Sequence, residues 1–365
     1  MWNPEPLLLV ISLFMSAFLS TCTAASTGGK PLVTAVTKDA STSLYTAPLK
    51  DGHPLLLDLS GPVISLPCAS KYGTITTTLS ANATDGTNPL FPVSFPAVAS
   101  CAPLPSKLPA GAVGVAGLAP SSQSFPAQVV RTQKVANKIA LCLPSDGKTT
   151  TGNSVGVAIF GGGPLVFIPP ERGDFTTMLA GTAPLHGYNG SPGYFISGTG
   201  INVEQSQAVA GPLVIELSST IPYTALRPDV YAPLVKAWDQ AASGPNFPWM
   251  QRLTPVAPFA RCYNSTKLPP TRLGYAVPEI DLVLEGGSTY FVVGGNSMVQ
   301  VNTNTACLGF VQMKAAGQAP AAILGGFQLE NHLLVVDEEK QQFGFTTFLN
   351  AIGLSCSSFN FTLAA

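Results

Sequence analysis

The chain has 365 residues, of which 46% are hydrophobic and only 10% are charged, and its formal net charge is −1. So little charge, with no run of Lys or Arg, leaves no electrostatic footprint for nucleic acid or for an anionic membrane. The 35 Gly and 33 Pro residues indicate many turns between short strands. We therefore expect a mainly β protein rather than a helical one.

An apolar run occupies residues 7–19 and is followed by small residues up to Ala24. Its length is typical of a secretory signal peptide and is too short for a transmembrane helix. We predict a signal peptide over residues 1–24, cleaved after Ala24, and a secreted mature protein that is not held in a membrane. The alternative of a helix buried in the core is disfavoured because Ser-, Thr- and Gly-rich sequence follows at once.

The first strands are predicted over residues 32–48, where β-branched residues flank a turn. A short helix should begin at Phe125, with a Pro in its first turn. A longer helix is predicted over residues 229–242, where Leu234 and Trp238 recur at helical spacing, so Trp238 is assigned to the core rather than to a ligand site. The glycines at 161–163 precede no Lys-Ser/Thr pair, which favours a turn over a phosphate-binding loop.

Cysteines and sequons fit an exported protein. If Cys22 leaves with the signal peptide, six cysteines remain, and an even number predicts three disulfides among fifteen possible pairings. No Cys-x-x-Cys pair occurs and the three histidines are isolated, so neither a metal site nor a cofactor is expected. Four Asn-x-Ser/Thr sequons predict glycosylation at Asn82, Asn189, Asn264 and Asn360.

A sequence layout that occurs twice in the chain bears on whether the protein can be an enzyme. Two apolar segments each run into a short polar loop, and each is followed later by an apolar–apolar–Gly signal, ending at Gly117 and Gly325. The layout resembles bilobal aspartic peptidases, whose catalysis needs two carboxylates that share one proton. The first loop contains Asp58, but Leu217 is assigned to the second carboxylate position. Glu216 is excluded as a substitute because a one-residue shift turns a strand side chain to the other face. We therefore predict that the protein is not an enzyme.

Further segments resemble the plant TAXI-type xylanase inhibitors, which are pepsin-fold proteins related to basic 7S globulins and nepenthesin-like peptidases. The matching segments run in order along nearly the whole mature chain: residues 33–39, 43–46, 114–119, 133–138, 158–164, 227–231, 274–278, 296–299 and 323–326. The resemblance implies a bilobal pepsin-like fold, with an N-terminal lobe over residues 25–195 and a C-terminal lobe over residues 196–365. It also implies the disulfides Cys68–Cys101, Cys142–Cys356 and Cys262–Cys307.

The N-terminal lobe departs from that family by its length. Asp58 and Gly117 are 59 residues apart, whereas Leu217 and Gly325 are 108 apart. We predict a shortened first lobe that lacks the segment forming the flap hairpin, so no lid would cover a substrate strand in the cleft. A true deletion and a faulty gene assembly would give the same sequence.

The inhibitory loops are the second departure. In the best-studied family members, a His from a C-terminal loop lies between the two catalytic carboxylates of a family-11 xylanase, and a Leu from another loop fills a substrate subsite. Leu273 matches that Leu, and Asn350 stands nearest the position of the His. A neutral Asn cannot make the charge-assisted hydrogen bonds of an imidazolium, so weakened inhibition of that enzyme class is expected.

The resemblance implies a monomeric, apoplastic, catalytically inactive protein that inhibits or binds a microbial cell-wall glycanase, an endo-1,4-β-xylanase, in plant defence. Two other functions stay open from the residues. One is a non-inhibitory extracellular binding protein of the storage-globulin type. The other is an active aspartic endopeptidase, which the single carboxylate at Asp58 disfavours.

Overall fold

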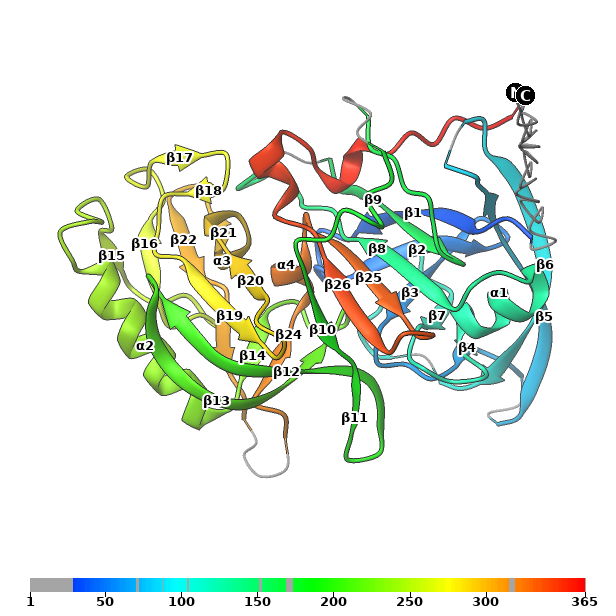
Figure 1. The fold of residues 1–365 in the computed structure, drawn as a ribbon, viewed down its shortest axis with the longest axis horizontal. Helices are drawn as coiled ribbons and strands as arrows, with labels where there is room; N and C mark the ends of the chain where they lie inside the picture. Colours follow the sequence, from blue (N-terminus) through cyan, green and yellow to red (C-terminus); the bar gives the residue numbers. More distant parts are fainter. Residues whose placement is uncertain are drawn as a thin grey trace, which may run out of the picture.

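The computed structural model describes residues 29–69, 72–86, 88–103, 105–150, 153–168, 173–314 and 319–364 (Figure 1). The predicted signal peptide lies outside these residues. Two β-rich halves lie side by side, with the blue and cyan N-terminal strands in one and the yellow strands in the other (Figure 1). The expected mainly β fold is confirmed. No helix among the described residues is long and apolar enough to cross a membrane.

The largest sheet contains twelve strands and includes both the first strand, β1, and the last strand, β26, of the described chain. Its order is β10 (Gly181–Pro184), β26 (Gln342–Phe345), β25 (Leu333–Asp337), β8 (Lys138–Cys142), β9 (Val155–Phe160), β1 (Leu32–Lys38), β2 (Tyr45–Lys50), β3 (His53–Asp58), β7 (Gly114–Gly117), β4 (Ile64–Leu66), β6 (Phe91–Cys101) and β5 (Thr74–Ala83). Because β25 pairs with β8, a C-terminal segment is built into the sheet of the first half.

The second half is built on an eight-stranded sheet. Its order is β20 (Thr289–Val292), β19 (Ile280–Leu284), β12 (Ser191–Val203), β13 (Ser206–Leu217), β24 (Ala322–Leu324), β14 (Thr224–Leu226) and β23 (Phe310–Gln312), with β11 (His186–Tyr188) paired to β12. The smaller sheets contain β15 (Arg252–Leu253), β16 (Cys262–Asn264), β22 (Thr305–Leu308) and β21 (Met298–Asn302), and β17 (Pro270–Thr271) with β18 (Gly274–Tyr275). The predicted lobe boundary after residue 195 falls inside β12 and stays a prediction.

The long edge strand β5 has an uneven set of partners. It forms a ten-residue antiparallel ladder with β6. Only Asn82 and Ala83 also pair with β1, so the end of β5 closes the sheet back on its first strand. Over residues 74–81, β6 is the one ladder partner that β5 has among the described residues. This part of the sheet is therefore an edge.

The helices begin and end close to the predicted residues. The first predicted helix is α1 (Phe125–Gln133), which carries Pro in its first turn. The second is α2 (Pro228–Ala242), one residue longer at its start than predicted. Trp238 is fully buried and its indole N–H donates to the Tyr263 hydroxyl at 2.9 Å, which confirms its assignment to the core. The short helices are α3 (Gly294–Ser297), α4 (Gly326–Leu329), η1 (Leu349–Ile352) and η2 (Cys356–Ser358).

Three disulfides join the same cysteine pairs that the resemblance implies. Cys68 is bonded to Cys101 beside the β5–β6 hairpin. Cys262 is bonded to Cys307 across two paired strands. Cys142 is bonded to Cys356 over a sequence separation of 214 residues. The last bond holds the C-terminal segment against β8, where β25 already pairs.

Candidate functional site in the interlobe cleft

The two polar loops occupy corresponding places in the two halves. In the first half, β3 pairs in parallel with β7, so that Asp58 lies opposite Gly117. In the second half, β13 pairs in parallel with β24, so that Leu217 lies opposite Leu324. The residue opposite Gly325 is therefore one step later in the chain, and it is Ser218. The structural counterpart of Asp58 is Ser218.

The prediction that Leu217 holds the second dyad position is therefore wrong by one residue. Leu217 is 1% exposed and packs in the core, as Leu57 does in the first half. Sequence reasoning misplaced it because the register of this loop is set by the pairing of β13 with β24, which lies about a hundred residues further along the chain. The register thus places a serine, and not an acidic residue, at the counterpart of Asp58.

Ser219 ties the two loops together. Its hydroxyl donates to the carbonyl oxygen of Leu57 at 2.7 Å and accepts a hydrogen bond from the amide of Leu59 at 3.1 Å. Both contacts are buried and join residues about 160 positions apart. The sequence analysis did not single out Ser219, because the partners of its hydroxyl are backbone groups of the other half.

Asp58 lies half-buried at the end of β3. Its Oδ1 accepts a hydrogen bond from the Ser60 amide at 2.9 Å. Burial raises the pKa of Asp58 above its ordinary value, although the hydrogen bonds from the Ser60 and Gly61 amides oppose that shift. A carboxyl with a raised pKa can act as an acid, but dyad chemistry needs a second group that shares its proton.

Glu216 reaches the loop of Asp58, contrary to the geometric argument that excluded it. The Ser60 hydroxyl donates to Glu216 Oε1 at 2.9 Å. Burial raises the pKa of Glu216, the Ser60 hydrogen bond opposes the rise, and the negative charge of Asp58 adds to it. The register explains the error: Glu216 lies two residues before Ser218, and residues two apart in a strand share a face. Ser60 therefore contacts both carboxyl groups, Asp58 through its amide and Glu216 of β13 through its hydroxyl.

The two predicted inhibitor residues differ in how they are exposed. Leu273 lies in the turn between β17 and β18 and is partly exposed. Asn350 lies in η1 and is only 6% exposed. Its assignment as a contact residue is therefore corrected, because this side chain faces the interior and cannot enter a partner's cleft from this conformation. The next residue, Ala351, is the exposed one.

The loops that carry these residues nevertheless lie next to each other. The Gly295 amide donates to the Leu273 carbonyl oxygen at 2.6 Å. A Cβ added at Gly295 would lie 2.7 Å from the ring of Phe348 and 3.1 Å from that same oxygen, so only glycine fits between the two loops. Figure 1 shows the red C-terminal segment and the yellow β17–β18 hairpin at the same edge of the molecule. We call residues 271–274 and 348–352 the loop face.

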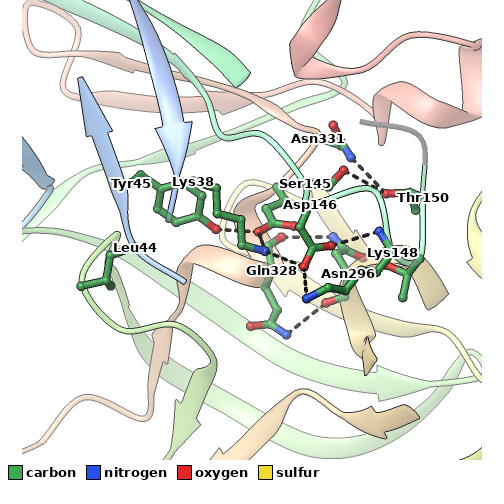
Figure 2. A network of polar contacts seen from close by, with 12 residues as sticks. Lys38, Leu44, Tyr45, Ser145, Asp146, Lys148, Thr150, Asn296, Gln328 and Asn331 are labelled. Atoms are coloured by element: carbon green, nitrogen blue, oxygen red, sulfur yellow. Dashed lines mark hydrogen bonds and ion pairs between the residues drawn. The ribbon is translucent and has the colours of Figure 1, made fainter. Parts of the chain in front are cut away.

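A buried polar network, missed in the sequence, joins the two halves (Figure 2). Lys38 Nζ lies 2.7 Å from Glu330 Oε1 and 3.8 Å from Asp146 Oδ2, and the Tyr45 hydroxyl donates to Glu330 at 2.7 Å. Lys38 and Glu330 are 5% and 2% exposed. Burial raises the pKa of Glu330 to about 7 against the influence of Lys38. At Lys38 the carboxylates prevail over burial, and the pKa rises. No local sequence signal connects residues this far apart.

The four predicted glycosylation sites are all at least partly exposed. Asn189 is exposed in a turn, and Asn82, Asn264 and Asn360 are partly exposed. Glycosylation at these four positions stays a prediction. Across the described ranges, no three His, Cys, Asp or Glu side chains gather closely enough to hold a metal ion.

These features define the class of protein. Paired strands that lead into matching loops in two halves, with the loops joined by the Ser219 hydroxyl, are the layout of a pepsin-like fold. The chain belongs to the TAXi family of xylanase inhibitors: the family model described as xylanase inhibitor N-terminal matches residues 55–162, and that described as xylanase inhibitor C-terminal matches residues 193–347. The resemblance seen in the sequence is confirmed.

Similarity to known proteins agrees with this family assignment. The chain is 49% identical to a protein of Oryza sativa subsp. japonica named Chitinase CLP, over 98% of this chain and 99% of that protein. That alignment spans 430 positions against 365 residues here, so at least 65 positions have no counterpart in this chain. The crystal structure of edgp is similar with a TM-score of 0.81 and 25% identity, covering 92% of this chain and 99% of that one. An aspartic proteinase from Irpex lacteus shares the fold, with a TM-score of 0.60, 13% identity, and coverage of 89% and 99%.

Proposed function

We propose that this protein is a secreted, non-catalytic member of its family that binds and inhibits a microbial cell-wall endo-1,4-β-xylanase in plant defence. The observation that carries the proposal is the loop face, on which the loop of Leu273 and the segment that begins at Phe348 come from distant parts of the chain and meet at Gly295. Ala351 is an exposed residue of that second segment. The family models named for xylanase inhibitors support the class of partner. Ser218 in place of a second carboxylate supports the absence of peptidase activity.

Inhibition is tested with the mature protein and a family-11 xylanase. Truncating a partly exposed anchor at an interface costs about 1–3 kcal/mol, so Leu273→Ala should weaken inhibition about 5- to 150-fold. Ala351→Glu should weaken it as well, because it places a charge before the acidic cleft of the enzyme. Val98→Ala, an exposed position on β6 in the other half, is the matched control and should leave inhibition unchanged. Equal inhibition by all variants would show that recognition uses another surface.

Peptidase activity is tested separately, by haemoglobin digestion at acid pH with and without pepstatin. We expect no pepstatin-sensitive cleavage, since Ser218 cannot share a proton with Asp58. Haemoglobin digestion that disappears in Asp58→Ala would refute the non-catalytic assignment.

Secretion is tested on the exported protein, whose N-terminal sequence should begin at Ala25.

A second candidate function is hydrolysis of chitin-type glycans. Two observations favour it: the relative that shares 49% identity is named a chitinase, and Asp58 and Glu216 both have raised pKa values beside a shared Ser60. Glycosidases use a pair of carboxyl groups, one of them protonated at the working pH. Hydrolysis of chitin oligosaccharides that is lost in both Asp58→Asn and Glu216→Gln would establish it. If neither inhibition nor hydrolysis is found, the storage-globulin-type binding function takes its place.

A further inference from the structure

A cavity of about 360 Å³ lies between the two halves, beside the polar network of Figure 2. The first half contributes Lys38 at the end of β1, Ser43 from the β1–β2 connection, and Asp146 with Lys148 from the loop after β8. The aromatic side chains of Tyr223, Phe259 and Phe327 come from the second half. Its volume is at the small end of ligand pockets, with room for about one or two sugar rings.

The charges at the cavity are balanced within the protein. Asp146 Oδ2 lies 3.0 Å from Lys148 Nζ and 3.8 Å from Lys38 Nζ, and Glu330 takes the shortest contact with Lys38. Two ammonium groups thus face two carboxyl groups. While both carboxyl groups are ionised no charge is left over, so a strongly charged ligand would have to break an existing pair, whereas a neutral polar ligand can accept and donate hydrogen bonds without doing so.

One wall of the cavity is aromatic. The ring of Tyr223 packs edge-to-face on Phe259, with centroids 4.7 Å apart, and lies 6.1 Å from Phe327. Phe259 and Phe327 are buried, while Tyr223 is partly exposed. In the part of the chain that the structure describes, no hydrogen bond is made by the Tyr223 hydroxyl or the Ser43 side chain. A ligand with one apolar face and several hydroxyls matches this combination.

We propose that this cavity binds a neutral pyranose unit of an oligosaccharide. The apolar face of the sugar would pack on Tyr223, and its hydroxyls would bond to the Tyr223 hydroxyl, Ser43 and the Asp146 carboxylate. The proposal goes beyond glycanase inhibition, because it requires no enzyme partner. The outcome of the xylanase assay therefore neither supports nor refutes it.

Calorimetric titration of the mature protein tests the proposal with xylotriose and with triacetylchitotriose as neutral probes. Saturable binding of either supports it, and comparing the two identifies the source of the sugar. Tyr223→Phe keeps the ring but removes one hydrogen bond, so it should raise the dissociation constant about 2- to 12-fold. Asp146→Asn removes a charged acceptor and should raise it about 10- to 150-fold. Tyr72→Phe, at a residue 83% exposed and outside the cavity, should change nothing.

Three results would overturn the proposal. The first is that neither neutral probe binds to wild-type protein whose circular dichroism shows it to be folded. The second is binding that is unchanged in both Tyr223→Phe and Asp146→Asn, which would place the sugar elsewhere. The third is that trigalacturonate, or the peptide pepstatin, binds in the titration more tightly than the neutral sugars, which would assign the cavity to another ligand class.

Discussion

Replacing the buried carboxyl between the two halves has a defined effect on stability. Glu330 is 2% exposed, and its neighbours are the Lys38 ammonium and the Tyr45 hydroxyl. The Glu330→Gln substitution keeps the shape and an acceptor oxygen but removes the ability to titrate. The difference in unfolding free energy between the wild type and this variant should therefore depend on pH.

The direction in which stability changes with pH follows from the direction of the Glu330 pKa shift. Burial raises the pKa of Glu330 from its ordinary 4.5 to about 7, so the folded state holds a proton that the unfolded chain releases. The stability that this proton confers is fully present below pH 4.5 and is lost as the pH rises through 7. A shift of this size corresponds to about 3 kcal/mol between pH 4 and pH 8. Over that range, the unfolding free energy of Glu330→Gln should rise by about 3 kcal/mol relative to that of the wild type.

Urea unfolding at pH 4, 6 and 8, followed by tryptophan fluorescence, measures this difference. Glu339→Gln is the matched control, because Glu339 is exposed and its carboxyl oxygen accepts only a backbone amide hydrogen bond from Asn137. The control should keep a constant offset from the wild type. If Glu330→Gln instead falls further behind the wild type as the pH rises, the Lys38 ion pair outweighs burial and the reasoning is refuted.

Three further predictions concern the scaffold. Removing the Cys142–Cys356 bond, which spans 214 residues, should lower the free energy of unfolding by about 2–5 kcal/mol, measured by thermal unfolding. The loss should exceed that from removing Cys262–Cys307, which spans 45 residues, and an equal or smaller loss would contradict the loop-entropy argument. Ser219→Ala should cost about 1–3 kcal/mol, because it leaves Leu57 and Leu59 backbone groups without their buried partner; an unchanged urea midpoint would count against it. Amides of β5 over residues 74–81 should exchange with deuterium faster than those of β12 over residues 200–203, because β12 pairs there with both β13 and β19 whereas β5 is an edge. Equal protection would mean that the edge is covered.

The parts of the molecule that could be predicted are those with a local or family signal. Helical spacing located α2 and assigned Trp238 to the core, and a Pro near Phe125 marked the start of α1. The disulfide pairs followed from the family resemblance, because six cysteines alone leave fifteen pairings open.

The parts that could not be predicted depend on long-range register and burial. Whether Leu217 or Ser218 matches Asp58 is decided by the pairing of β13 with β24, which a loop sequence does not encode. The position of Glu216 followed from the same register. Asn350 looks like a polar loop residue in the sequence, but its backbone turn in η1 directs the side chain inward.

The position of Ser218 also shows how the two loops are held together without an acidic residue there. The contacts that hold the two loops together belong to Ser219, whose hydroxyl bonds backbone groups of the first half, and they need no carboxylate at position 218. Two carboxyls close together in a partly buried site repel each other and stabilise the fold only while one is protonated. A serine at 218 adds no further charge to those of Asp58 and Glu216 and leaves the Ser219 contacts intact. The hydrogen bonds that join the two loops therefore do not depend on an acidic residue at position 218.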